Sequence, residues 1–157
     1  MDIQFILEKV HKRSIFSIRA YRILFTDSEI FFVHLGEDSS QLPLGQAMGG
    51  LVGAAAQSIA NKMSEKEISK KLNQLENEDI NRTIASDKRN FKTAYSQLDG
   101  FESAPYKWNC WPHITFKIRG KGDSKFTFDT QMEDLEEERQ AIIGFMRGKR
   151  PDLVKSR

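Results

Sequence analysis

Two stretches of the chain alternate apolar with polar residues and reverse direction at a turn, and no other feature of the sequence constrains the fold as strongly. The first covers residues 14–35 with its turn at residues 26–29, and the second covers residues 114–128 with its turn at residues 120–123. A period of two is typical of strands with one buried face, and Gly and Asp favour tight turns. The sequence therefore predicts two β-hairpins.

The buried parity changes within the first hairpin. Its apolar residues occupy even-numbered positions as far as Ala20 and odd-numbered positions from Tyr21 onward. A β-bulge or strong bend near Ala20 would reconcile the two halves, because one extra residue moves every later side chain to the other face. The two sets are Phe16, Ile18 and Ala20, followed by Tyr21, Ile23 and Phe25. Such a bend is typical of curved sheets. Further along the chain, an extended pattern begins again at Asn90.

Helical spacing predicts further elements before and between these strands. The apolar residues of segment 2–10 recur at intervals of three and four, which predicts a short helix with Asp2 at its positive end. Ser64 and Glu67 form a capping box that begins a second helix. The apolar spacing slips afterwards, so this helix either bends or is followed by a third short helix that Asn77 caps.

A last amphipathic helix is predicted from Glu133 to Arg147. Thr130 and Glu133 form its capping box, and Gly148 ends it. Five acidic residues at the start of this helix complement the positive end of the helix dipole, which explains them without a carboxylate site: Glu133, Asp134, Glu136, Glu137 and Glu138. The tail, residues 152–157, is predicted to be loose.

Small residues recur at nearly every fourth position between residues 42 and 60. Gly45, Gly49 and Gly53 line one face of a predicted helix, which lets another backbone approach closely. The segment has few large apolar residues, so a packed helix is favoured over a membrane span. We expect this face to mediate self-association.

The length and charge of the chain limit its organisation and its partners. With 157 residues, a single domain over residues 1–157 is expected. The single cysteine cannot form an internal disulfide, and residues 1–4 do not begin a secretory leader, which together favour a cytoplasmic protein. The net charge is only +2, and the basic residues are interleaved with acidic ones, so no nucleic-acid partner is expected.

No catalytic or cofactor-binding constellation is found in the sequence. Cys110 and His113 form one Cys-x-x-His pair, but a zinc site needs at least three protein ligands, and a thiolate nucleophile needs an oriented base. The glycines at 49, 50 and 53 lack the Lys-Ser/Thr pair of a phosphate-binding loop. The sequence therefore predicts a protein that is not an enzyme and has no cofactor or metal.

Three segments, 21–33, 90–98 and 114–128, carry a family resemblance. An apolar strand meets Thr-Asp and a second apolar strand, a Phe is followed by Tyr-Ser, and paired strands precede the last helix. Together they resemble the bacterial pleckstrin-homology-like and GRAM-like domains. The resemblance implies an α+β fold, in which a bent antiparallel β-barrel or roll is plugged by the C-terminal helix.

In that arrangement residues 14–35 and 90–147 form the barrel core with its closing helix, and residues 42–89 form a helical insert. The resemblance also implies binding of lipid head groups. The first hairpin loop at residues 26–29 is acidic, however, so the usual phosphoinositide pocket is not expected there.

Three binding functions follow as hypotheses. The first is a scaffolding module that binds a protein partner or itself through the glycine face. A Pro-bounded loop with Tyr106, Trp108 and Trp111 offers a second contact surface, unless these aromatics cap the open end of the barrel. The third hypothesis, after the membrane hypothesis described next, is a small-ligand site at the barrel mouth.

The second hypothesis is a peripheral membrane module. Four apolar residues of the glycine-rich segment would touch lipid, and four basic residues would meet anionic head groups. The apolar residues are Leu44, Met48, Leu51 and Val52, and the basic residues are Lys12, Arg13, Lys88 and Arg89. Salt would weaken the charged contribution.

Overall fold

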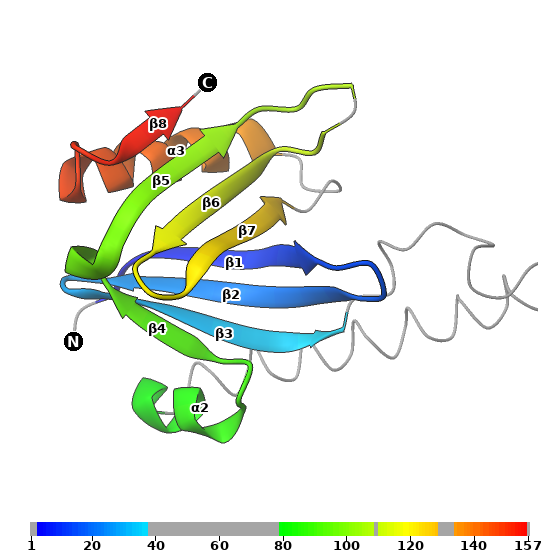
Figure 1. Ribbon diagram of the computed structural model, residues 1–157, viewed down its shortest axis with the longest axis vertical. Helices are drawn as coiled ribbons and strands as arrows, with labels where there is room; N and C mark the ends of the chain where they lie inside the picture. Colours follow the sequence, from blue (N-terminus) through cyan, green and yellow to red (C-terminus); the bar gives the residue numbers. More distant parts are fainter. Residues whose placement is uncertain (1–2, 38–78, 109, 129–133, 157) are drawn as a thin grey trace, which may run out of the picture.

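The computed structural model describes residues 3–37, 79–108, 110–128 and 134–156 (Figure 1). The strands are β1 (Ile3–Arg13), β2 (Ile18–Thr26), β3 (Glu29–Glu37), β4 (Phe91–Ala94), β5 (Leu98–Ala104), β6 (His113–Ile118), β7 (Gly122–Phe128) and β8 (Val154–Ser156). The helices are α2 (Ile80–Ser86) and α3 (Leu135–Lys149), and the 3-10 turn η2 is Tyr95–Gln97. The predicted glycine-lined helix and the helix expected from Ser64 lie outside the described residues.

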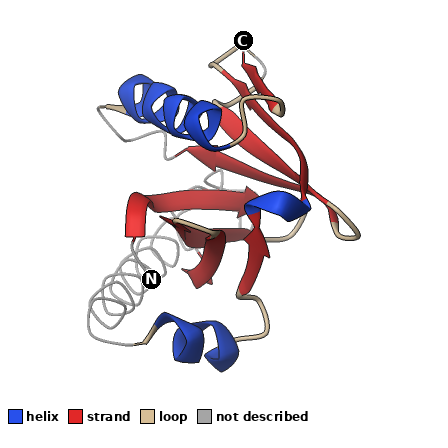
Figure 2. Cartoon of the chain, turned by 90° about the vertical axis from the view of Figure 1, so that its left-hand side faces the viewer, coloured by secondary structure: helices blue, strands red, loops and turns tan. Residues whose placement is uncertain are grey.

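The strands form one mixed, mostly antiparallel sheet in the order β4-β3-β2-β1-β7-β6-β5-β8. Among the described residues, two pairs join β1 to β7, Val10 with Phe128 and His11 with Thr127. Figure 2 shows the two halves of the sheet meeting at a steep angle about this junction. The expected barrel is wrong, because the sheet stays open between β4 and β8. The C-terminal strand β8 occupies the free edge of β5 instead.

The N-terminal segment is strand β1, and the predicted helix over residues 2–10 is wrong. Leu7 pairs with Ile23 and Val10 with Tyr21, so three residues of β1 span two residues of β2. This β-bulge returns Val10 to the face that Leu7 occupies, and both side chains are fully buried. The bulge therefore produced the three-residue spacing that imitates a helix.

The first predicted hairpin is confirmed as β2 and β3, and the second as β6 and β7. The register between β2 and β3 shifts between Ala20 and Tyr21, where the parity change predicted a bulge. The turn between β6 and β7 has Gly120 and Gly122 at φ 79° and 83°, a conformation that side chains disfavour. Phe16 was expected to point inward, but it lies in the β1–β2 turn and is 92% exposed.

The main core fills the concave side of the sheet and is rich in phenylalanine. Phe32 stacks on Phe91 with ring centroids 4.3 Å apart and on Phe126 at 5.5 Å, and Phe116 meets it edge-on at 5.2 Å. A smaller cluster on the other face of β2 and β3 is covered by Ile80 of α2. Because β2 and β3 are covered on both faces, their apolar runs are nearly continuous.

The third-helix alternative is borne out by α2, with a different cap from the one expected. Asp79, rather than Asn77, accepts a hydrogen bond from the backbone N–H of Asn81 at 3.0 Å. After α2 ends at Ser86, residues 87–90 form the turn that leads into β4.

The C-terminal helix is confirmed, but its end and the tail differ from the prediction. Helix α3 passes through Gly148 and ends at Lys149. The tail is not loose, since β8 pairs in parallel with β5. Arg150 donates to the carbonyl of Tyr95 at 2.6 Å and pairs with Asp152, so one side chain anchors the start of the tail.

A buried arginine joins α3 to the sheet. Arg139 is 2% exposed, donates to Ser103 Oγ at 3.1 Å and forms a bidentate pair with Glu136 at 2.7 and 2.9 Å. Hydrogen bonds from Arg139 and Gln140 lower the pKa of Glu136 to about 2.

We expect this pair to make stability depend on acid pH. A carboxyl whose pKa is lower in the folded state stabilises the fold at neutral pH and loses that contribution as the pH falls. The stability difference between wild type and Glu136→Gln should therefore be largest above about pH 5 and shrink toward pH 2. Urea unfolding of both proteins across this range measures it. A difference that does not change with pH would contradict the assignment.

Candidate functional site

Five basic residues surround a cavity of about 540 Å³ near the turn that joins β1 to β2. We call this cavity the basic pocket. Its basic residues are Lys12, Arg19, Lys88, Arg89 and Lys121. Tyr21, Phe91, Asp123 and Ser124 complete its lining.

Three parts of the fold bring these charges together. Lys12 of β1 and Arg19 of β2 are cross-strand partners, and they lie next to the last pair before the β1–β2 turn, Arg13 with Ile18. Lys88 and Arg89 lie in the turn between α2 and β4, and Lys121 lies in the β6–β7 turn. The site thus depends on sheet pairing between segments more than 100 residues apart in the sequence.

Buried polar groups fix the turn that carries Lys88 and Arg89. Asn90 Oδ1 accepts the backbone N–H of His34 at 2.6 Å, and Asn90 Nδ2 donates to the carbonyl of Thr83 at 2.8 Å. Asp87 accepts the backbone N–H of Arg89 at 2.9 Å and lies 3.2 Å from His34 Nδ1. Burial alone would raise the pKa of Asp87, but these two interactions outweigh it and lower that pKa.

A tyrosine ties the same turn to β2. Burial raises the pKa of Tyr21, so its phenol stays protonated. The hydroxyl donates to the backbone carbonyl of Arg89 at 3.3 Å.

The two lysines at the centre of the pocket stand over aromatic rings. Lys121 Nζ lies 4.1 Å from the centroid of Phe91, and Lys12 Nζ lies 5.7 Å from the same centroid. Burial, together with the charges of Lys121 and Arg19, lowers the pKa of Lys12. The neighbouring charges add to the effect of burial, and a bound anion would offset their repulsion.

Acidic groups compensate only part of this charge. Arg19 lies 3.4 Å from Glu37, and Arg89 lies 3.9 Å from Asp87. Asp123 is the acidic residue among those that line the basic pocket. Within the described ranges, Lys12, Lys88 and Lys121 form no ion pair with a carboxylate. The arrangement can hold a multiply charged anion through several charge-assisted hydrogen bonds.

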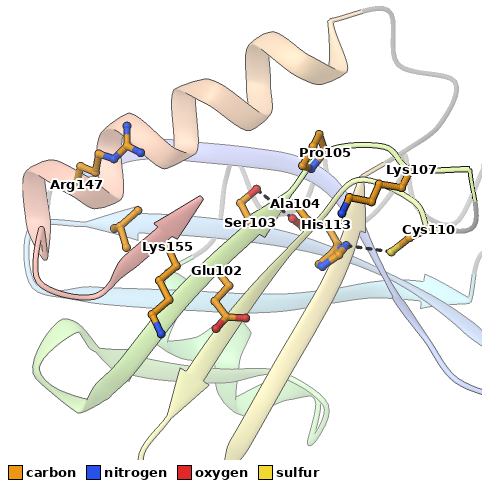
Figure 3. Close-up of a pocket in the computed structure, with 10 residues that line it drawn as sticks. Glu102, Ser103, Ala104, Pro105, Lys107, Cys110, His113, Arg147 and Lys155 are labelled. Carbon is orange, nitrogen blue, oxygen red and sulfur yellow. Dashed lines mark hydrogen bonds between the residues drawn. The ribbon is translucent and has the colours of Figure 1, made fainter. Parts of the chain in front are cut away.

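A second cavity of about 630 Å³ lies between β5, β8 and the β5–β6 loop. Figure 3 shows Arg147 at one side of it and the Cys110–His113 contact at the other. The thiol lies 3.6 Å from His113 Nδ1, which is also 2.9 Å from the carbonyl of Trp111. That carbonyl can only accept, so Nδ1 carries the proton and is not a base for the thiol.

No group of three potential metal ligands occurs in the part of the chain that the structure describes. Figure 3 shows Arg147 and Lys155 on one side of the larger cavity and Lys107 on the other.

The structure brings three of the four predicted head-group residues together. Lys12, Lys88 and Arg89 line the basic pocket, whereas Arg13 does not, because successive residues of a strand point to opposite faces. Arg13 donates to Thr127 Oγ1 at 3.2 Å. The predicted lipid-contact residues Leu44, Met48, Leu51 and Val52, and the glycines Gly45, Gly49 and Gly53, lie outside the described residues.

Sequence reasoning missed Arg19 and Lys121 as members of the site. Pairing the ends of β1 and β2 across a four-residue turn would have placed Arg19 beside Lys12. No comparable signal pointed to Lys121, because its position depends on how the two halves of the sheet meet.

The aromatic loop between β5 and β6 is exposed. Tyr106 is 61% exposed, Trp108 89% and Trp111 45%, so the loop leaves large aromatic surface in solvent. Trp111 packs against Tyr106, with centroids 5.9 Å apart, and lies 5.9 Å from the Arg13 guanidinium.

Comparisons with family models, curated proteins and solved structures find no match to this chain. What stands is an α+β architecture with an eight-stranded mixed sheet and a C-terminal helix. Among the helices in the described ranges, none has the length and apolarity to cross a bilayer.

Proposed function

We propose that this chain is a non-catalytic binding module that holds a phosphate-bearing polyanion in the basic pocket. One observation carries the proposal: three lysines without a carboxylate partner among the described residues converge with two arginines on one cavity. Like charges so close together repel one another, and a bound polyanion relieves that repulsion. The aromatic floor of Phe91 holds the ammonium groups in place before binding.

Strand order supports a pleckstrin-homology-like relationship as a further part of this proposal. Among the described residues, strands β1 to β7 precede helix α3, with helix α2 between β3 and β4, and a bend divides the strands into two halves. Lipid head groups are phosphate-bearing anions, so a ligand of this class agrees with that resemblance. The expected location in the cytoplasm, peripheral to a membrane, belongs to the same proposal.

Self-association through Gly45, Gly49 and Gly53 stays a separate prediction. Its residues lie outside those that the structure describes, and the basic pocket neither needs it nor opposes it.

Binding of inositol hexakisphosphate, a soluble polyphosphate, tests the proposal. Isothermal titration should detect binding at about 0.1 M salt that weakens strongly at about 1 M salt. The double variant Lys12→Gln/Lys121→Gln should bind about 100-fold more weakly, because two charge-assisted contacts of about 1.5 kcal/mol each are lost.

Lys125→Gln is the matched control, since Lys125 is exposed on β7 and does not line the basic pocket. It should bind as the wild type does. Absence of binding by the wild type at low salt, or equal losses in the control and the double variant, would contradict a ligand site in this pocket.

A further inference from the structure

We infer that the end of the sheet carrying the β1–β2 turn and the β5–β6 loop docks on the surface of an anionic bilayer. This inference rests on the proposed function and names a lipid head group as the anion of the basic pocket. Both loops lie on the same side of the molecule in Figure 1, and β7 lies between β1 and β6 in the sheet.

The β1–β2 turn holds two large apolar side chains in solvent. Ile15 and Phe16 are each 92% exposed. Ser14 and Ser17 close the turn beneath them through a backbone hydrogen bond of 2.9 Å and a hydroxyl contact of 2.9 Å. A turn fixed in this way presents its apolar tip without further ordering, which favours insertion into an apolar phase.

The β5–β6 loop adds aromatic residues of the kind that settle at a membrane interface. Trp and Tyr combine an apolar ring with a polar group, and this suits the head-group region. Trp108 is the most exposed of them at 89%. Contacts across strands fix the loop beside the hairpin, since the N–H of Phe128 donates to the carbonyl of Pro112 at 3.0 Å and Arg13 lies against Trp111.

Charge complementarity selects an anionic bilayer as the occupant. No acidic residue occurs from Lys9 to Thr26 or from Ser103 to Gly122, the two stretches that contain the loops. Lys12 and Arg19 of the basic pocket pair directly below the tip, within about 7 Å of the turn by the strand rise. An inserted tip would therefore bring the basic pocket to the level of the head groups.

Neither feature suffices by itself for stable attachment. Two apolar side chains give weak partitioning, and so does one charged site, whereas both together multiply the affinity. The predicted behaviour is therefore binding to anionic vesicles that needs the tip and the pocket at once.

Vesicle flotation with phosphatidylcholine alone, and with phosphatidylcholine and phosphatidylserine, tests the inference. Wild type should float only with the anionic vesicles and less at high salt. The double variant Ile15→Ser/Phe16→Ser should lose at least about tenfold in vesicle affinity and keep its affinity for inositol hexakisphosphate. Ile3→Ser, at an apolar position that is 49% exposed elsewhere on β1, should behave as wild type.

Tryptophan emission gives an independent measurement. The chain has two tryptophans, both in the β5–β6 loop, so transfer of this end into the interface should shift the emission to shorter wavelength. The shift should occur with anionic vesicles and be absent with neutral ones.

The outcomes separate this inference from the proposed function. Binding of inositol hexakisphosphate without flotation would overturn the docking surface and leave the basic pocket as a site for a free anion. Equal flotation of wild type and the tip variant would also overturn it. If the wild type is a dimer, the tip variant is a monomer and neither protein floats, this end of the sheet contacts a second copy of the chain and the inference is overturned. Failure of wild type to bind either probe would contradict the proposed function itself.

Discussion

Phe32→Ala should lower the free energy of unfolding by about 4 kcal/mol, the typical loss for a phenylalanine in a close-packed core. Phe32 is fully buried and contacts three other phenylalanine rings. One of them is Phe91, on which the lysines of the basic pocket stand. Urea unfolding monitored by circular dichroism measures the change, and anion binding of the folded variant should weaken as well.

The control is Phe16→Ala, the same substitution at a site that is 92% exposed. Its free energy of unfolding should stay within about 0.5 kcal/mol of wild type. Similar losses in the two variants would mean that the aromatic stack of Phe32 is not the centre of the core.

Asn90→Ala should cost about 2 kcal/mol of stability, because the buried backbone N–H of His34 loses its acceptor, whereas the Thr83 carbonyl keeps the hydroxyl of Ser86. The backbone N–H of His34 and the carbonyl of Thr83 lose their amide partner. The same change releases the turn that carries Lys88 and Arg89. Affinity for inositol hexakisphosphate should therefore fall even where the protein is still folded.

Thermal or urea unfolding of Asn90→Ala beside Asn81→Ala measures the effect, since Asn81 is exposed on α2. The second variant should change stability by less than about 0.5 kcal/mol. A variant Asn90→Ala with normal anion affinity would show that the network does not position the basic turn.

Sequence periodicity predicted the strands that keep one register over most of their length. The pairs β2–β3 and β6–β7 were found, and the parity change at Ala20 located a real bulge. Strand β1 was missed because its own bulge lies between Leu7 and Val10, and a three-residue interval between buried residues is also what a helix produces. Periodicity cannot distinguish the two without knowledge of the partner strand.

Two features could not be predicted from local patterns, because they depend on contacts between distant segments: the open edge of the sheet and the membership of the basic pocket. The tail residues Val154 to Ser156 are too few to give a strand signal, yet they take the edge of β5 and leave the sheet open. Lys12, Lys88 and Arg89 were chosen for their charge, whereas Lys121 joins them only through the fold. The basic pocket was therefore predicted in part, and the exposed tip at Ile15 was not predicted.

An open sheet has two outer strands whose backbone groups are available to other chains, and here both strands are short. Strand β4 has four residues and β8 has three. Long, flat edges recruit further strands and lead to aggregation, whereas such brief edges offer few backbone donors and acceptors. The fold can thus remain unclosed without inviting edge-to-edge polymerisation, and exposed side chains, rather than its strand edges, are the natural place for recognition.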